Sequence, residues 1–321
     1  MKEISIHDIK NIRIGQTEDP IGATGVTVFL SETGMAAGLD VRGGGPASRE
    51  SQLLSPLAAA QTIHAVVLSG GSAYGLDAGG GVMAFLEEKG IGFDVGVAKV
   101  PLVCQASLFD LAVGDPKARP DKAMGYRAAQ CAWERNYRDG NLGAGCGATI
   151  GKLRLMERCM KSGIGSCAVQ VGQLQVGAVA AVNALGDVYD WRTGQLVAGL
   201  RDEAGTGLES SEERLIRAAD VVENRFTGNT TLGVVLTNGS FDKSRLCKIA
   251  GMAQDGYARS IRPIHTTADG DSIFALSVGS VPADLDVTGT LAALAVSEAI
   301  LRAVKSAQSA CGYPAWRDMK R

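Results

Sequence analysis

Histidine is scarce in this sequence, and its cysteines show no pairing pattern. Three histidines in 321 residues make a histidine-rich metal centre unexpected. The seven cysteines are odd in number, irregularly spaced and without a CxxC motif, which argues against a disulfide framework or a zinc site. We read them mostly as small buried residues and expect no bound metal.

The sequence also lacks an excess of charge of either sign. Lysine and arginine total 32 against 34 aspartate and glutamate, a formal net charge of -2, and neither sign forms a long run. This balance gives no electrostatic reason to expect binding to nucleic acid or to an anionic membrane.

No long apolar run is free of charge. The N-terminal segment MKEISIHDIKNIRIG mixes charges into its apolar positions, so it lacks the apolar core of a secretory signal and favours a cytoplasmic protein. The most apolar stretch, 285–304, contains Asp286, Glu298 and Arg302, and its apolar residues recur at helical spacing. We predict a packed amphipathic helix there and no membrane span.

Two common functional motifs are missing. There is no GxSxG, and GGSAYG at 70–75 has one residue too many before its last glycine, which disfavours a conventional Ser-His-Asp hydrolase. The run NLGAGCGATIGK at 141–152 fails as a phosphate loop, because Cys146 replaces the first Walker glycine and Leu153 follows the lysine. Lys152 is then either an ordinary surface lysine or a cation in a pocket lined by glycine backbone.

The sequence does contain enough apolar residues for a full core. Apolar residues make up 45%, and 42 glycines are spread between apolar segments, which predicts a compact chain with tight turns. Length alone leaves one large domain or two open. Short apolar segments predict strands at 24–30, 65–69, 168–171, 174–183, 231–237 and 272–279. Helices are predicted at 81–89, 121–134, 211–221, 241–259 and 290–307.

The order of these elements predicts an α/β fold of stacked sheets. Gly172 and Gln173 separate two strands and indicate a hairpin, and short strands often follow one another without a helix between them. Several strands are apolar on both faces, so the sheets should be covered on both sides. We predict stacked mixed sheets between helical layers, since a purely parallel doubly wound sheet fits poorly.

A polar, glycine-punctuated segment from about 198 to 228 leads into the apolar strand that begins at Thr230. An exposed loop before a buried strand is a natural place for chain cleavage, although most such loops have no chemical role. A threonine hydroxyl needs a base, and the α-amine of the same residue becomes one once the preceding peptide bond is broken. That amine has a pKa of roughly 7.7 to 8.0. The alternative interpretation of Gly228–Thr231, GNTT, is a turn with a β-branched strand opener.

Three further polar residues stand at strand ends. Asp269 and Asp271 directly precede a predicted strand, and alternation would place both carboxylates on one side, where they could share protons or orient a nucleophile. A plain acidic turn is the alternative, and the calcium-loop pattern fails. Asn183 ends an apolar strand and could donate its amide to an oxyanion, or it could simply begin the NALG turn.

Taken together, several segments carry a family resemblance. They are VRGGGPASRE (41–50), LSGGSAYGLDAGGGVM (68–83), the stretch 100–115 ending FDLAVGD, GAGCGATIGK (143–152), AAVNALGDV (180–188), GNTTLGVVLTN (228–238) and HTTADGDSIFALSVG (265–279). In this order they resemble the L-aminopeptidase/D-esterase family, which also contains β-peptidyl aminopeptidases and endo-acting nylon-oligomer hydrolases.

The resemblance implies a single N-terminal nucleophile hydrolase domain over residues 1–321 with a four-layer αββα fold. It implies self-cleavage between Asn229 and Thr230 into a large chain, 1–229, and a small chain, 230–321. Thr230 would be the nucleophile toward a small amide or peptide substrate, with no cofactor. Family members form homo-oligomers, often tetramers.

By the same resemblance, Lys152, Asn183, Asp269 and Asp271 fall on the catalytic lysine, asparagine and acidic pair of the nylon-oligomer hydrolases. Phe109 stands where some members carry a tyrosine whose hydroxyl contacts the tetrahedral intermediate, so that donor is absent. We expect Phe109 and the backbone of Gly143 and Gly145 to line the substrate pocket.

Two other classes stay open. An acyltransferase of the ornithine-acetyltransferase type would pass the acyl group to an amine instead of water. A non-catalytic binding protein of the same fold would never cleave itself.

Overall fold

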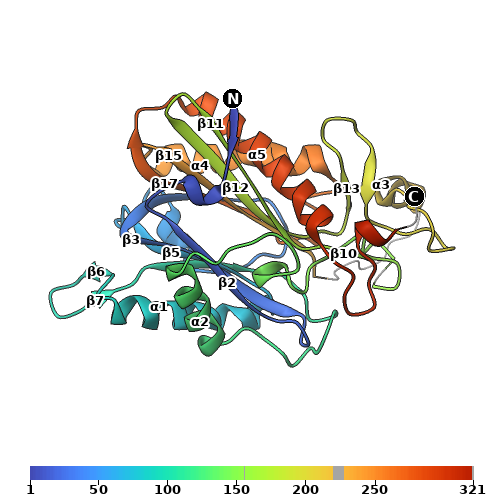
Figure 1. Ribbon diagram of the computed structural model, residues 1–321, viewed down its shortest axis with the longest axis horizontal. Coiled ribbons are helices and arrows are strands. Elements are labelled where there is room, and N and C mark those ends of the chain that lie inside the picture. The colour runs from blue at the N-terminus through green and yellow to red at the C-terminus, as the bar shows by residue number, and fades with distance from the viewer. Residues whose placement is uncertain (155, 220–227, 320–321) are drawn as a thin grey trace.

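The computed structural model describes residues 1–154, 156–219 and 228–319 of the chain. Figure 1 shows four layers: helices α4 (Lys243–Ser260) and α5 (Leu285–Ser306) on one side, two stacked sheets, and helices α1 (Ala78–Glu88) and α2 (Lys122–Trp133) on the other side. This is the predicted αββα sandwich. It arises because the strands are apolar on both faces, so each sheet packs on a helical layer and on the other sheet.

The first sheet has the strand order β1-β11-β12-β15-β17-β3. Its strands are β1 (Lys2–Ile4), β11 (Ile164–Val171), β12 (Leu174–Asn183), β15 (Thr230–Gly239), β17 (Ser272–Val281) and β3 (Thr24–Val41). The pair β15 and β17 is parallel and its other pairs are antiparallel, so the sheet is mixed as predicted. The turn between β11 and β12 contains Gly172 at φ +59°, which confirms the hairpin.

Strand β3 also runs through the second sheet. Its first half pairs with β2 (Arg13–Asp19) and β5 (Ile63–Ser69), and its last residues pair with β17, with an irregularity between Leu30 and Met35. The second sheet continues from β5 to β8 (Val103–Ser107) and β4 (Ala47–Arg49). One long strand therefore joins the two stacked sheets.

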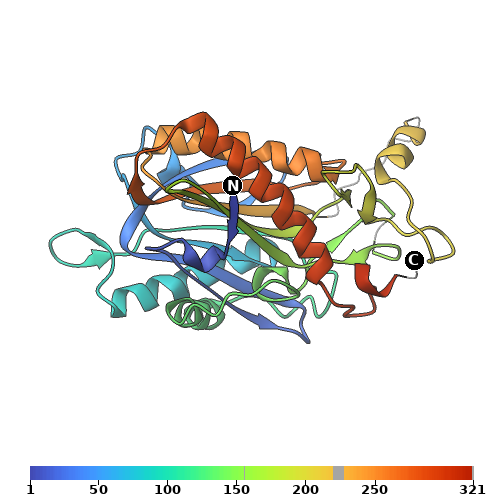
Figure 2. The same cartoon turned by 45° about the horizontal axis from the view of Figure 1, so that its top comes forward.

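Three apolar clusters lie between the four layers. The middle cluster joins Phe29 and Leu68 of the second sheet to Val234 and Phe274 of the first, all fully buried. The outer clusters pack α4 and α5 on the first sheet, and α1 and α2 on the second. Figure 2 shows α5 crossing the strands that it covers.

Helix α5 confirms the packed helix predicted for the most apolar stretch. It is the one helix, in the part of the chain that the structure describes, with the length and composition to cross a membrane, and 72% of that apolar window is buried inside the protein. It begins at Leu285, earlier than the predicted Thr290, because the Asp284 side chain accepts from the Val287 N–H and caps it.

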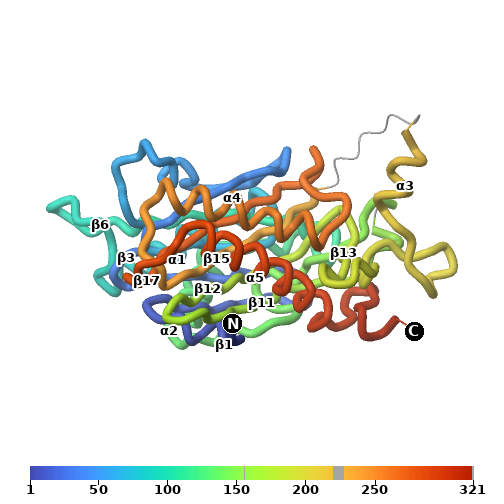
Figure 3. The backbone as a smooth tube through the Cα atoms, turned by 90° about the horizontal axis from the view of Figure 1, so that it is seen from above, coloured from blue at the N-terminus to red at the C-terminus, as the bar shows by residue number. Residues whose placement is uncertain are grey.

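Smaller elements complete the fold. Helix α3 (Ser211–Arg217) ends earlier than predicted, because the backbone N–H of Ala218 caps its last carbonyls. Residues 220 and 221 of the predicted helix, and residues 220–227 of the polar segment, lie outside the described residues. In Figure 3, α3 and the C-terminus lie at one end of the molecule and the β6–β7 hairpin at the other. The remaining strands are β6 (Phe93–Asp94), β7 (Lys99–Val100), β9 (Thr149–Ile150), β10 (Met160–Lys161), β13 (Asp187–Tyr189), β14 (Leu196–Ala198) and β16 (Ile261–Arg262).

Candidate active site

The predicted nucleophile lies where three strands of the first sheet end. Thr230 is the first residue of β15, and Asn183, the last residue of β12, is its cross-strand partner. On the other side of β15, an isolated parallel bridge pairs Asn229 with Asp269, three residues before β17 begins. Because the strand interiors are apolar, the polar residues gather at this edge. Thr230 is only 4% exposed.

Lys152 is buried in the site and is no surface lysine. Its backbone N–H donates to the Leu185 carbonyl at 2.9 Å, which fixes the loop after β9 beside the end of β12. Its Nζ donates to both oxygens of Asn183, at 2.9 Å to the backbone carbonyl and 2.8 Å to Oδ1. Burial disfavours the charged form and lowers the pKa of Lys152 to about 7.

Three residues hold Asn183 and orient its side chain. Its Oδ1 accepts from Lys152 and from the Thr149 N–H at 3.0 Å, and its Nδ2 donates to the Phe109 carbonyl at 2.8 Å. In the uncut chain, Lys152 and Asn183 thus donate to protein oxygens beside the Thr230 strand end.

The two carboxylates approach Thr230 from the loop before β17. Asp271 Oδ1 accepts from the Thr231 N–H at 2.7 Å, and its Oδ2 accepts from the His265 N–H at 3.1 Å and lies 3.0 Å from His265 Nδ1. Asp269 Oδ2 accepts from the Thr266 backbone and hydroxyl, at 3.0 and 2.5 Å. Burial, and then the charge of Asp271, raises the pKa of Asp269 to about 6. The pair is therefore a hydrogen-bonded part of the site, not a solvated acidic turn.

The peptide bond before Thr230 has a donor that the sequence did not indicate. The Asn229 carbonyl accepts from the Gly270 N–H at 2.9 Å and also from the Thr230 hydroxyl. A Cβ at position 270 would lie 2.6 Å from Thr230 Oγ1, so this close approach requires glycine. In the sequence, the one signal for this donor is the glycine between Asp269 and Asp271.

Of the predicted pocket residues, Phe109 is at the site. Its carbonyl holds Asn183, and its ring packs against Gly228. Gly143 and Gly145 are fully buried against the sheets: a Cβ at Gly143 would meet Thr27 Oγ1 at 2.3 Å, and one at Gly145 would meet the Ile164 nitrogen at 2.3 Å. These contacts give both glycines a packing role, and their place in a substrate pocket stays a prediction.

Two buried charges behind the site were not predicted. Lys161 Nζ donates to the carbonyls of Ala148 and Ser162 at 2.8 and 2.7 Å, and burial lowers its pKa to about 8. Lys161 thereby fixes the backbone at Ala148, and the next residue, Thr149, donates its N–H to Asn183. Asp110 accepts from the Gly71 N–H at 2.7 Å, burial raises its pKa to about 6, and it anchors the loop that carries Phe109. Isolated charges in sequence do not reveal such supporting roles.

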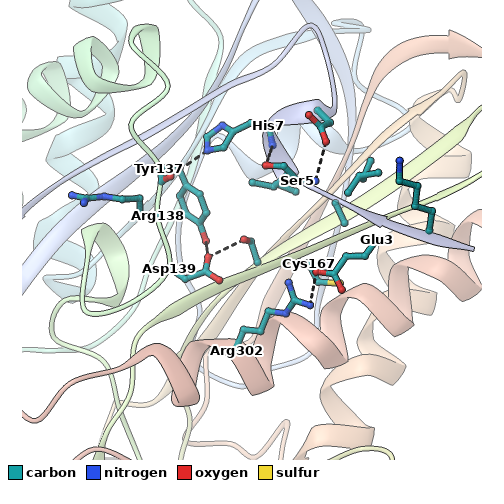
Figure 4. Close-up of a pocket in the computed structure, with 14 residues that line it drawn as sticks. Glu3, Ser5, His7, Tyr137, Arg138, Asp139, Cys167 and Arg302 are labelled. Atoms are coloured by element: carbon teal, nitrogen blue, oxygen red, sulfur yellow. Dashed lines mark hydrogen bonds and ion pairs between the residues drawn. The ribbon is translucent and has the colours of Figure 1, made fainter. Parts of the chain in front are cut away.

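A separate hollow of about 560 Å³ lies beside the N-terminal strand β1. Figure 4 shows that several of its polar groups are paired with one another. Asp139 accepts from the hydroxyls of Tyr137 and Ser166 at 3.0 and 2.8 Å, and Arg302 donates to Glu3 at 2.9 Å. The Arg302–Glu3 pair ties β1 to α5, and the Asp139–Ser166 pair ties the segment after α2 to β11. Within the described residues, no group of three or more histidine, cysteine or acidic side chains could hold a metal ion.

The layered fold defines the class of protein to which the chain belongs. The structure is similar to that of a Burkholderia sp. beta-aminopeptidase, with a TM-score of 0.69 and 17% sequence identity. The match covers 96% of this chain and 88% of that chain. The structure also matches the L-aminopeptidase D-Ala-esterase/amidase from Ochrobactrum anthropi, described as a variant of the Ntn hydrolase fold, with a TM-score of 0.66 and 18% identity over 94% and 86% of the two chains. The fold is that of the Ntn hydrolase aminopeptidases.

The chain belongs to peptidase family S58, whose family model matches residues 5–315. It is 38% identical to an uncharacterized aminopeptidase of Mycobacterium leprae, over 98% of this chain and 94% of that protein. It is 29% identical to the 6-aminohexanoate-oligomer endohydrolase of an Agromyces species, over 95% and 83% of the two chains. The predicted family is thereby confirmed, and the protein is a hydrolase that acts on peptide or other amide bonds.

Proposed function

We propose that the chain cleaves its own backbone between Asn229 and Thr230 and then hydrolyses amide bonds with Thr230 as the N-terminal nucleophile. The observation that carries this proposal is the environment of one peptide bond. The Thr230 hydroxyl contacts the carbonyl that it would attack, that carbonyl accepts from Gly270, and Lys152, Asn183 and the two aspartates gather around the same strand end.

In self-cleavage, Thr230 Oγ1 attacks the Asn229 carbonyl carbon, and the negative charge develops on the carbonyl oxygen. The Gly270 N–H already donates to that oxygen and stabilises the charge. The hydroxyl proton passes to the Thr230 nitrogen as the C–N bond breaks, which leaves an ester on Oγ1. Water then attacks the ester and releases the Asn229 carboxylate together with a free Thr230 amine and hydroxyl.

In substrate hydrolysis, the new α-amine accepts the Oγ1 proton during attack on a substrate amide. The amine product takes that proton and leaves, and water releases the acid from the acyl-threonine ester. Asp271, bound to the Thr231 N–H, and Asp269 hold the strand end and balance the charge of the Thr230 ammonium. Lys152 keeps Asn183 in place and supplies positive charge to the site.

The test compares Thr230→Ala with Thr231→Val, since Thr231 is the adjacent buried threonine and its side chain takes no part in the mechanism. Thr230→Ala should stay one chain and hydrolyse no amide substrate, whereas Thr231→Val should be cut and active. Normal cleavage or activity in Thr230→Ala would refute the assignment. Product that forms only when an acceptor amine is added would instead identify an acyltransferase.

A further inference from the structure

The residues before the cleavage site map the place where the acyl part of a substrate binds. This inference rests on the proposed function, because both reactions then pass through an ester on Thr230 Oγ1. In the first ester the acyl group is the end of the large chain, Gly228–Asn229. A substrate acyl group forms its ester with the same oxygen, so it must enter the space that those two residues occupy in the uncut chain.

The first acyl unit is held as a strand. The Asn229 N–H donates to the Ala268 carbonyl at 3.0 Å, and the Asn229 carbonyl accepts from the Gly270 N–H at 2.9 Å. These two bonds form the parallel bridge between Asn229 and Asp269. The pattern requires an N–H one carbon away from the reacting carbonyl, which is the spacing of an α-amino acid. A longer spacing in a β-amino acid moves its N–H away from Ala268.

The second acyl unit, Gly228, packs against the aromatic ring of Phe109. At Gly228 a Cβ would meet the Phe109 ring at 2.4 and 2.6 Å, and Gly228 has φ +66°, in the left-handed region. Both features exclude side chains there, since real Cβ atoms do not approach so closely and L residues rarely adopt that φ. The backbone of Phe109 also accepts from Asn183, so replacing only its ring leaves that contact in place.

We propose that the acyl subsite is a strand-docking edge formed by residues 268–270, which binds an extended α-peptide, and that Phe109 restricts the second unit before the cut bond to glycine. The preferred substrate is therefore an α-peptide that continues beyond the first unit and carries glycine as the second unit before the cut bond. Main-chain bonds to a strand edge give the binding, and the ring gives the selectivity.

The test uses cleaved wild-type enzyme and three blocked anilides: acetyl-glycyl-asparaginyl, acetyl-alanyl-asparaginyl and acetyl-glycyl-β-alanyl anilide. The measured quantity is kcat/KM from the release of aniline. Wild type should prefer glycine to alanine in the second unit by roughly a hundredfold or more, because left-handed backbone alone costs roughly tenfold and the close contact with the Phe109 ring adds to that cost. The β-alanyl substrate should be cleaved more slowly than the asparaginyl one that shares its glycine.

Phe109→Ala should reduce the glycine preference to roughly tenfold, because it removes the close contact with the ring but leaves the φ requirement. Phe109→Leu is the second variant if the alanine form does not fold. Phe93→Ala, an exposed phenylalanine in the distant β6–β7 hairpin, is the matched control and should keep the wild-type ratio.

Equal rates for glycine and alanine in wild type, or an unchanged ratio in a folded Phe109 variant, would overturn the subsite assignment alone. So would cleavage of other anilides but none of these three. A wild-type chain that never cleaves itself would refute the assignment of Thr230 as the nucleophile, and the subsite assignment would fail with it. The two failures are therefore distinguishable.

Discussion

At the scale of single residues, the site consists of charges that the fold removes from water. Lys152 is 3% exposed and Asp269 is fully buried. Burial lowers the pKa of the lysine to about 7 and raises the pKa of the aspartate to about 6, so the two values approach each other. The aspartate is charged above its pKa and the lysine below its own, and both are charged together only between about pH 6 and pH 7.

Self-cleavage should therefore have a bell-shaped pH dependence if both charges act. The rate should rise through about pH 6 as Asp269 loses its proton and fall above about pH 7 as Lys152 loses its own. Newly translated chain shifted to buffers of different pH, and sampled over time on a denaturing gel, gives the rate constants. In Lys152→Arg the guanidinium keeps its charge, so the alkaline limb should disappear. A rate that does not change across this range would contradict the account.

Gly270→Ala should slow self-cleavage at least roughly tenfold, because its Cβ would displace the Thr230 hydroxyl or the N–H that holds the Asn229 carbonyl. The time course of chain cleavage measures this. Gly251→Ala is the matched control, since a Cβ in that helix would meet its nearest atom at 3.5 Å, an ordinary contact. Equal rates in wild type and Gly270→Ala would exclude this N–H as the oxyanion donor.

At the scale of elements, strand ends explain why part of the site could be predicted. Apolar runs located β12, β15 and β17, and polar residues at their ends, Asn183, Thr230 and Asp271, could be read directly from the sequence. Which of these ends meet depends on sheet order, in which β15 lies between β12 and β17. The family resemblance supplied that association, because composition and periodicity do not contain it.

Other contributions had no pattern to follow. The Gly270 N–H is a backbone group, and any residue except proline would carry one, so only the three-dimensional approach of Thr230 gives it a role. Lys161 bonds to Ala148, 13 residues away, and Asp110 bonds to Gly71, 39 residues away. Such positioning depends on burial and pairing over long sequence separations, which local patterns do not encode.

The N-terminal cap of α5 is an element-scale feature with a measurable effect. Asp284→Ala removes the acceptor of the Val287 N–H and should lower the free energy of unfolding by about 1 kcal/mol. Urea unfolding in a Thr230→Ala background keeps the chain in one piece for this comparison. Asp255→Ala, exposed on α4, should change the same free energy by less than about 0.5 kcal/mol. An equal effect of the two substitutions would contradict the capping assignment.

At the scale of the whole molecule, the cut would divide the first sheet from within. Residues 230–321 contribute β15 and β17, which lie between β12 and β3 of the other chain, together with α4 and α5. The small chain thus forms the centre of the sheet and one outer layer. Its apolar residues belong to the outer cluster under α4 and α5 and to the middle cluster, both of which also include residues of the large chain.

The two chains should consequently stay together after cleavage. Removing the small chain would expose apolar residues of the large chain in two shared clusters, a cost larger than the usual margin of stability. Native size-exclusion chromatography of cleaved protein should give one peak that contains both chains in equal amounts, and they should separate only in denaturant. Separate native peaks would contradict this arrangement.

The central claim is that Thr230 becomes the N-terminus of a new chain, and intact-mass spectrometry of the denatured wild-type protein tests it most directly. The account predicts two masses, those of residues 1–229 and 230–321, with Thr230→Ala giving the single mass of residues 1–321. One intact mass for the wild type, or a cut at any other bond, would contradict it.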